Sequence, residues 1–556
     1  MYRYNGTGYF ALIEDECFSI GLSGEVFFRL KPMSPVHANG QQDEDTFLSG
    51  PIIEENGRET TVTWTAGSNL WAQKEYIFRL TPDLATYSVR VCGSGRVDSI
   101  DYFLGNPSAR FPGSSYDAAD YYAPLGLANE KTTNRIFTTA ESTALTILNY
   151  TPTPMAFSFR MADVNERLLL GVAALPDNAN FLSFGYRSIT SFPDVARFCM
   201  NADFLGYQEV EGEWESPALL MLSAQTDLSA LARYAEWHYA QGLPRARTGD
   251  IPAWWKGPYF CGWKEQAVVP SCKSVFDVFD GASQSCYQTM ADTLDERGLR
   301  PSAIIIDDKW QGEYGVGLPD PKKWPDMRAW VDGQHEKGRR VILWFMSWNA
   351  EGLPEEECIL SETGERLTAD PTSPAYRARI RSLMHTLLSA DEGCMNADGF
   401  KIDFADRLPK ERNMRIHEKN VYGVALLRRF FELIYAEAKA VKPDALVNTS
   451  CCHPLFAALT DQARLHDAFF AQRDSVRMMK ERADLFSAMI PGLSIDTDSG
   501  SSSSRRDFLR YARASVHMGV PDIYILHPIE DCTLTPDDWN EIRLLWEAYR
   551  KENNLG

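Results

Sequence analysis

Two opposite charges interrupt an apolar run in the segment 399–407, Gly-Phe-Lys-Ile-Asp-Phe-Ala-Asp-Arg. Residues 400–404 have the pattern of a short buried strand, and because side chains alternate along a strand, Lys401 and Asp403 share one face. Burial of such charges is costly unless they lie at an open end of the strand, where they can do chemistry. We therefore predict that Lys401 and Asp403 belong to an active site.

A second strand of the same design lies upstream. The isoleucines 304–306 run directly into Asp307 and Asp308, and Trp310 follows. Apolar strands that end in carboxylates are typical of the catalytic face of a (β/α)8 barrel, where the carboxyl ends of eight strands converge. Carboxylates, cations and indoles together suit a sugar, because flat aromatic faces contact its C–H groups and charged groups bind its hydroxyls. The predicted substrate contacts are Trp263, Asp307, Asp308, Trp310, Trp344, Trp348, Lys401, Cys451 and Arg473.

Glycoside hydrolysis by the usual route needs two carboxyl groups that face each other across the scissile bond. We predict Asp403 as the nucleophile, kept ionised by Lys401, and Asp474, at the end of the sixth strand, as the acid/base. A retaining enzyme places these groups about 5–5.5 Å apart. Three other residues compete with Asp474 for the second role: Asp467, Asp496 and Asp498.

Metal catalysis is not expected from the histidines. Of the nine, only His453 and His527 lie near a predicted strand end, and no pair has the spacing of helical metal ligands. We interpret both as structural groups and predict no metal site.

The elements that must position these residues fall into two halves. Residues 1 to about 225 contain many short segments of alternating apolar and polar residues, which predict an antiparallel β-sandwich. A helix is expected at 227–242, with a boundary near 245–252. The predicted domains are a sandwich at 1–226, a linker helix and connection at 227–254, and a catalytic barrel at 255–556.

The second half alternates strands and helices as a (β/α)8 barrel does. The strands are expected near 259–262, 303–308, 341–344, 400–403, 445–448, 468–472, 493–496 and 523–526. The helices are expected at 286–297, 327–337, 375–388, 421–440, 475–488, 506–518 and 536–551. A doubly wound sheet is the alternative, but no glycine-rich phosphate loop follows any of these strands.

Charge and composition exclude several partners. The net charge is −20 and no basic cluster stands out, which argues against nucleic acid and anionic membranes. No window approaches the ~18 apolar residues of a membrane span, and the start has no signal-peptide pattern. The eleven cysteines show no C-x-x-C spacing, so we expect reduced thiols and a cytoplasmic location. A homo-oligomer is left open.

The motifs, in their order along residues 255–530, resemble glycoside hydrolase family 36, which contains α-galactosidases and raffinose synthases. Gly262-Trp263 is similar to the G-W of the first strand, and residues 306–311 to I-D-D-G-W-Q, with Lys309 in place of the glycine. Lys401-Ile-Asp403 is similar to the K-x-D nucleophile motif. Cys451 stands where the family has a strand-end cysteine. Arg473-Asp474 stands at its S-D-x-x-D acid/base segment.

The resemblance implies an N-terminal β-supersandwich and a site that needs no metal or organic cofactor. It implies that Asp307 and Asp308 bind galactose O4 and O6, that Lys401 binds the O3/O4 side, and that Trp310 lines the sugar pocket. The predicted function is a retaining exo-α-glycosidase, foremost an α-galactosidase acting on an oligosaccharide or glycoside. The alternatives are a transglycosidase, a related α-glycosidase of the α-N-acetylgalactosaminidase or α-glucosidase type, and a non-catalytic sugar-binding protein.

Overall fold

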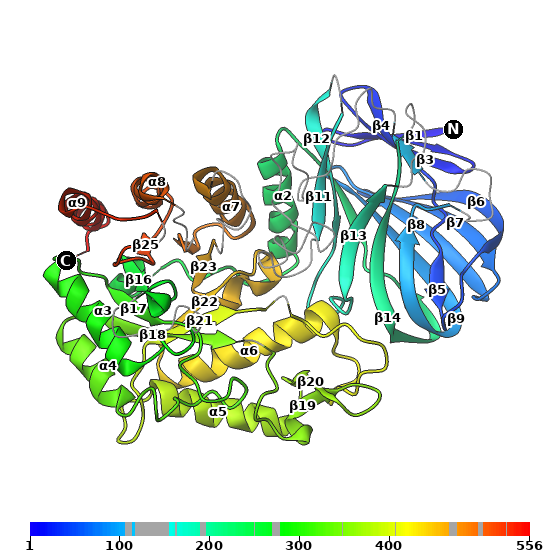
Figure 1. Cartoon of the computed structure of the whole chain (residues 1–556). Helices are drawn as coiled ribbons and strands as arrows, with labels where there is room; N and C mark the ends of the chain where they lie inside the picture. The colour runs from blue at the N-terminus through cyan, green and yellow to red at the C-terminus, as the bar shows by residue number, and fades with distance from the viewer. Residues whose placement is uncertain are drawn as a thin grey trace. The chain divides into compact units, whose positions relative to one another are not determined.

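The computed structural model describes residues 1–105, 114–116, 155–161, 164–188, 196–249, 251–268, 278–346, 348–405, 407–465, 475–498, 504–529 and 531–555. These residues divide between two compact units (Figure 1). The first lies within 1–143, 152–243 and 409–427, and the second within 144–151, 244–408 and 428–556.

The first unit is an antiparallel β-sandwich, as predicted. Alternation builds it: along β7 (Glu59–Ser68), Thr60, Val62, Trp64 and Ala66 are buried, and the residues between them are half-exposed. The other described strands are β1 (Tyr2–Asn5), β2 (Phe10–Glu14), β3 (Cys17–Leu22), β4 (Glu25–Leu30), β5 (Val36–Ala38), β6 (Asp45–Asn56), β8 (Gln73–Leu80), β9 (Ala85–Tyr102), β10 (Ser114–Tyr116), β11 (Ala156–Met161), β12 (Val164–Val172), β13 (Ser183–Ser188), β14 (Ala196–Glu215) and β15 (Leu219–Ala224).

The sandwich core is rich in aromatic rings. Phe18 and Phe78 stack with their centroids 3.9 Å apart, and Phe28 meets Phe159 edge to face at 5.1 Å. Such pairs contribute about 0.5–1.5 kcal/mol each beyond the burial of their surface. The core is therefore held by ring packing between strands distant in sequence.

The predicted helix at 227–242 is α2 (Asp227–Ala240), which begins in a capping box at Thr226. It packs on β11, β12 and β15, and the Tyr234 hydroxyl donates to the Val172 carbonyl at 2.6 Å. Helix α2 thus belongs to the sandwich unit.

A fully buried lysine lies inside the sandwich. The Lys74 ammonium on β8 is 2.5 Å from Asp43 Oδ2 and also pairs with Asp45. The Val36 amide donates to Asp43 Oδ2 at 2.7 Å, and the Tyr76 hydroxyl donates to Asp45 Oδ2 at 2.7 Å. Both carboxylates are thereby hydrogen-bonded on more than one side.

Residues 409–427 extend the sandwich unit from a distant part of the chain. The Met414 amide donates to the Tyr207 hydroxyl at 2.7 Å, and the Val424 amide donates to the Phe181 carbonyl at 2.9 Å. Gly423 has φ +59°, and a Cβ at this position would lie 2.0 Å from that carbonyl oxygen. Only glycine fits so close an approach with that φ.

The second unit contains a ring of eight parallel strands. They are β16 (Tyr259–Cys261), β17 (Ala303–Ile306), β18 (Arg340–Met346), β21 (Gly399–Asp403), β22 (Leu446–Thr449), β23 (Gln462–Arg464), β24 (Ser494–Asp496) and β25 (Asp522–Ile523). They pair in the order β24-β23-β22-β21-β18-β17-β16-β25, and a parallel bridge from Asp496 to Val520 closes the ring. This is a (β/α)8 barrel, and the doubly wound alternative is wrong.

Helices surround the barrel strands (Figure 1). They are α3 (Gln284–Glu296), α4 (Met327–Glu336), α5 (Pro374–Leu388), α6 (Gly423–Val441), α7 (Ser475–Met489), α8 (Arg505–Ser515) and α9 (Pro536–Glu552). A hairpin of β19 (Cys358–Leu360) and β20 (Arg366–Ala369) lies between β18 and α5 in sequence. Each helix overlaps a predicted one. Within the described residues, no helix has the length and apolar character that a membrane crossing requires.

The sixth barrel strand differs from its prediction. Strand β23 is Gln462–Arg464, whereas the sequence predicted a strand at 468–472. The prediction followed the apolar run Ala468-Phe-Phe-Ala471, but the barrel uses a short, polar stretch whose residues are all buried. Residues 466–474 lie outside the described residues, and with them Asp467, Arg473 and Asp474.

The cysteines also depart from expectation at one position. Nine of those described are free thiols, but Cys286 on α3 is bonded in a disulfide. The prediction of reduced thiols is wrong for Cys286.

Candidate active site

The predicted charged residues meet at the carboxyl ends of the barrel strands. In the register of β18 and β21, Trp344 is opposite Lys401 and Met346 is opposite Asp403. Asp307 and Asp308 follow the last residue of β17. Because parallel strands end at the same edge, three neighbouring strands deliver a lysine, an indole and carboxylates to one end of the barrel.

The Lys401 ammonium is the centre of a buried network. It lies 2.7 Å from Asp307 Oδ2, 3.1 Å from the Tyr524 hydroxyl, 3.5 Å from Cys261 Sγ and 3.9 Å from Asp498 Oδ2. Burial opposes its charge, but the carboxylates of Asp307 and Asp498 outweigh burial and raise the pKa of Lys401 well above its ordinary value. Lys401 is therefore a fixed positive charge.

Asp403 is the least buried acid of this network, with 15% of its side chain exposed. Arg464 Nη2 donates to its Oδ1 at 2.8 Å, and Trp344 Nε1 donates to its Oδ2 at 3.0 Å. The Phe404 amide also donates to Oδ1 at 2.9 Å, from a residue with φ +54°. Such a left-handed non-glycine residue costs of order 1–3 kcal/mol and is typical of functional sites.

The cation paired with Asp403 is not the one that the sequence suggested. Lys401 is committed to Asp307, whereas Arg464 on β23 bridges Asp403 and Asp498, donating to Asp498 Oδ2 at 2.9 Å. Arg464, rather than Lys401, is therefore the cation that pairs with Asp403. The only signal for Arg464 was a polar tripeptide, Gln-Ala-Arg, which shows no strand pattern in the sequence.

Asp308 is a second carboxyl at this end of the barrel, and its residue is 8% exposed. The Tyr314 hydroxyl donates to its Oδ1 at 2.6 Å. Burial raises the pKa of Asp308 to about 7, and the negative charges of Asp307 and Asp403 add to this effect against the hydrogen bond from Tyr314. Asp308 can therefore hold or release a proton near neutral pH.

Lys309 braces the loop that carries Tyr314. Its ammonium is 2.8 Å from Glu351 Oε2 and 3.6 Å from the centroid of the Tyr314 ring. The same Glu351 oxygen accepts from the Tyr314 amide at 2.8 Å. Lys309, at the position where the similar motif I-D-D-G-W-Q has a glycine, thus holds the loop whose Tyr314 hydroxyl contacts Asp308.

Three of the four predicted tryptophans are buried, at 0–3% exposure. Trp310 is fully buried and its Nε1 donates to the Trp344 carbonyl at 2.8 Å. Trp348 is 3% exposed, stacks on Phe430 at 4.8 Å and donates to a backbone carbonyl. Trp344 is 1% exposed, and its Nε1 donates to Asp403. Trp263 is half-exposed.

Cys451 is 1% exposed, in the segment that follows β22. The histidines near the strand ends have structural partners: His453 Nδ1 accepts from the Leu455 amide at 3.1 Å, and His527 Nδ1 is 2.6 Å from Glu265. In the described part of the chain, no group of three or more His, Cys, Asp and Glu residues could hold a metal ion.

A separate pair of acids lies deeper in the barrel. Asp496 accepts from Asn448 Nδ2 at 2.7 Å, and burial followed by the charge of Asp498 raises its pKa to about 7. Asp522 is fully buried, and within the described residues no side chain donates to it. Burial and the charge of Asp496 raise the pKa of Asp522 well above its ordinary value.

Several solved structures have a fold similar to that of this chain. No protein-family model matches the sequence, and no curated protein is similar to it. Among solved structures, the chain is similar to the α-N-acetylgalactosaminidase NagBb from Bifidobacterium bifidum, with a TM-score of 0.65 and 12% identity over 100% of this chain and 94% of that one.

A sulfoquinovosidase of family GH31 from E. rectale has a TM-score of 0.57 and 12% identity over 97% of this chain and 82% of that one. A cycloalternan-forming enzyme from Listeria monocytogenes has a TM-score of 0.53 and 9% identity over 98% and 57% of the two chains. At these identities the likeness is one of fold.

Proposed function

We propose that the protein is a retaining exo-α-glycosidase. The observation that carries the proposal is Asp403, a partly exposed carboxylate at the end of the fourth barrel strand. Arg464 and Trp344 hold its two oxygens, and Phe404 beside it has a strained backbone. A nucleophile must be oriented and reachable, and these contacts fix the Asp403 carboxylate while 15% of its side chain stays exposed. The fold shared with α-glycosidases supports the same reaction class.

In the proposed mechanism, an Asp403 oxygen attacks the anomeric carbon while the bond to the leaving oxygen breaks. Asp474 protonates that oxygen, and a covalent glycosyl ester on Asp403 results. Asp474 then removes a proton from water, which attacks the same carbon and releases Asp403. Two inversions give net retention.

The sugar hydroxyls would face the charged groups beside Asp403. Asp307, Asp308 and Lys401 are the proposed contacts, because they lie at the ends of β17 and β21, on either side of β18, and form one hydrogen-bonded network with Tyr314 and Tyr524. Trp263 and Arg473 are proposed as further substrate contacts. Terminal α-linked galactose is the proposed sugar, on the strength of the Asp307-Asp308 and Lys401-x-Asp403 motifs.

The test is turnover of 4-nitrophenyl α-glycosides of galactose, N-acetylgalactosamine and glucose, with product configuration followed by NMR. We expect release of α-galactose first. Asp403→Ala should lower kcat/KM by about 10⁴-fold or more, and azide should restore turnover by forming a β-glycosyl azide. Asp474→Ala with azide should instead form an α-glycosyl azide.

The matched control is Asp484→Ala, which removes an exposed carboxylate of α7 paired with Lys480. Its kcat/KM should equal that of the natural protein. Full activity of Asp403→Ala would exclude the mechanism, and sugar binding without turnover in the natural protein would favour a non-catalytic sugar-binding protein. Transfer to added sugars in preference to water would identify a transglycosidase.

A further inference from the structure

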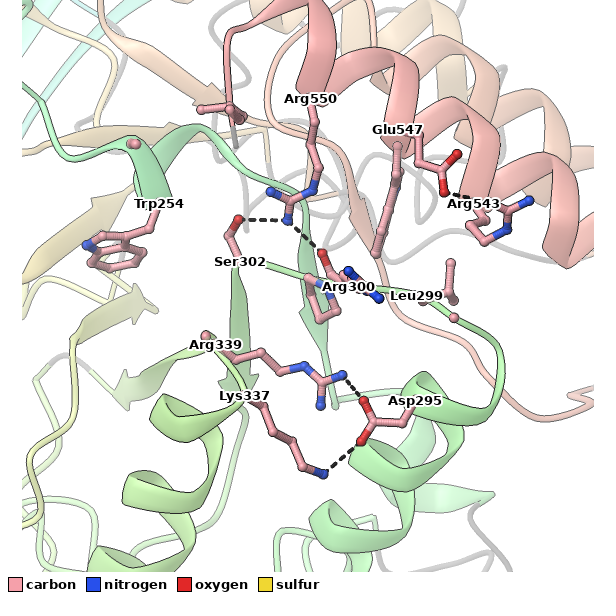
Figure 2. Close-up of a pocket in the computed structure, with 16 residues that line it drawn as sticks. Trp254, Asp295, Leu299, Arg300, Ser302, Lys337, Arg339, Arg543, Glu547 and Arg550 are labelled. Atoms are coloured by element: carbon pink, nitrogen blue, oxygen red, sulfur yellow. Dashed lines mark hydrogen bonds and ion pairs between the residues drawn. The ribbon is translucent and has the colours of Figure 1, made fainter.

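A cavity of about 920 Å³ lies at the amino ends of the barrel strands, away from Asp403. The turns that precede β17 and β18 line it, with the last helix, α9, and the short 3-10 helix Ala253–Lys256 (Figure 2). Ser302 and Arg339 immediately precede β17 and β18. The volume falls in the range of small-molecule sites, about 300–1,000 Å³.

The lining of this cavity is strongly cationic although the chain as a whole carries a charge of −20. Two carboxylates, Asp295 and Glu547, line it. Five cationic side chains also line it: Arg300, Lys337, Arg339, Arg543 and Arg550. A positive excess of this kind in an acidic protein marks a place where anions concentrate.

The two carboxylates are already engaged by three of the cations. Asp295 pairs with Lys337 at 2.7 Å and with Arg339. Glu547 pairs with Arg543, one turn earlier on α9. Figure 2 shows both groups at the cavity. Among the described residues, no carboxylate is therefore left in the lining for Arg300 or Arg550.

Arg550 uses neutral acceptors instead. Its Nη2 donates to the Arg300 carbonyl at 2.6 Å and to Ser302 Oγ at 3.0 Å (Figure 2). Burial lowers the pKa of Arg550, and the positive charge of Arg300 lowers it further. Two like charges held together at a cavity, one of them half-buried, oppose folding until an anion joins them.

We propose that this cavity is a second binding site, for a small molecule that carries a phosphate group, as a free phosphate ion or a sugar phosphate. The planar guanidinium groups of Arg300 and Arg550 suit the oxygens of a tetrahedral oxyanion. The half-buried indole of Trp254 offers a flat face to the rest of an organic ligand. The site is independent of the proposed glycosidase activity.

Binding there should stabilise the barrel. The cations come from α9 and from the turns before β17 and β18, so a shared anion would link the last helix to the strands. A ligand that binds only the folded state raises the melting temperature in a saturable way.

The experiment is a titration of the full chain with sodium phosphate and with glucose 6-phosphate at constant ionic strength, followed by thermal unfolding and calorimetry. The test variants are Arg300→Gln and Arg550→Gln. The matched control is Arg58→Gln, which removes an exposed arginine in the turn between β6 and β7. Phosphate strengthens folding of many proteins by exclusion from their surface, and this effect is common to all variants.

We expect saturable binding by the natural protein and by Arg58→Gln, and at least ten-fold weaker binding by each test variant. A response to glucose 6-phosphate alone would identify a sugar phosphate, and an equal response would identify free phosphate as sufficient. Unsaturable stabilisation shared by all four proteins, or equal affinity in all four, would overturn the proposal. Should Arg550→Gln fail to fold, Arg300→Gln decides, because the Arg300 side chain is exposed and substitutions of exposed residues usually change stability little.

Discussion

Each unit contains a buried lysine between two carboxylates, and the two clusters differ in what surrounds them. In the sandwich, Lys74 pairs with Asp43 and Asp45 and has no exposed side-chain surface. In the barrel, Lys401 pairs with Asp307 and lies 3.9 Å from Asp498. The same charges are thus buried in both units.

The sandwich cluster is closed, because amides and hydroxyls occupy its carboxylates. The barrel cluster continues through Arg464 from Asp498 to Asp403, which remains partly exposed. A buried ion pair whose polar atoms are all satisfied specifies a fold, whereas one that leads to a reachable carboxylate can do chemistry. The comparison teaches that exposure at the end of the network, rather than the ion pair itself, distinguishes the cluster that we propose for catalysis.

The largest expected effect comes from replacing the exposed acid. Asp403→Asn should lower kcat/KM by about 10⁴-fold or more and lower the melting temperature less than Asp45→Asn does, because Asp403 is partly exposed and Arg464 keeps its bond to Asp498. Asp45→Asn should lower the melting temperature and leave kcat/KM unchanged, because it removes one of the two partners of Lys74 and lies outside the barrel. Aryl α-glycoside turnover and thermal unfolding of both variants measure the contrast. Equal losses of stability in both would remove the distinction between the clusters.

The next largest difference is expected between substitutions of the two buried lysines. Removing one partner of a buried ion pair costs about 3–5 kcal/mol, so Lys74→Met should lower the free energy of unfolding by that amount. The folded fraction of Lys74→Met should have the same kcat as the natural protein. Lys401→Met should lose about 10²-fold or more in kcat in addition to stability, because it frees Asp307 beside the proposed sugar site. Urea unfolding and active-site titration separate the two effects, and a fully active Lys401→Met would contradict the proposal.

A pH effect should distinguish Asp308 from an ordinary acid. Its pKa is raised to about 7, whereas an unfolded aspartate titrates near 4, so the folded state holds the proton more tightly. Its contribution to stability is therefore full below pH 4 and is lost as the pH rises to about 7. Asp308→Asn should reduce the difference in unfolding free energy between pH 5 and pH 8 by about 1–3 kcal/mol.

The control for this pH effect has the opposite sign. The hydrogen bond from His335 and the charge of Lys442 outweigh burial and lower the pKa of Asp398. Its contribution is present above pH 4 and is lost in acid, so Asp398→Asn should reduce acid sensitivity instead. Denaturant unfolding across the pH range measures both slopes. An unchanged slope in Asp308→Asn would show that this carboxyl titrates normally.

The smallest effect concerns the indole that holds Asp403. Trp344→Phe removes the 3.0 Å hydrogen bond to Asp403 and should lower kcat about ten-fold, with KM nearly constant. Trp310→Phe removes a comparable bond to a backbone carbonyl and should affect stability more than kcat. Steady-state kinetics of the pair tests whether the indole contributes through the nucleophile.

The sequence predicted those residues of the proposed site whose charges interrupt a strong apolar pattern. Asp307, Asp308, Lys401 and Asp403 were predicted because each follows or interrupts a buried strand. Arg464 was missed because β23 is three residues long and polar, and a longer apolar run stood nearby. The remaining contacts depend on loops: no local pattern indicates that the Tyr314 hydroxyl turns back to Asp308. A tryptophan in the sequence can belong to a core or to a binding site, and Trp310, Trp344 and Trp348 are all buried.

Residues 409–427 belong to the sandwich unit, so this unit cannot finish folding before they have been synthesised. A nascent chain that has completed α2 still lacks the stretch that supplies the Met414 and Val424 amides to Tyr207 and Phe181. The first unit can be completed only after four barrel strands have been synthesised, the fourth of which, β21, ends in Asp403. A fragment cut after α2 should consequently expose surface that the intact protein covers, and should be prone to aggregate.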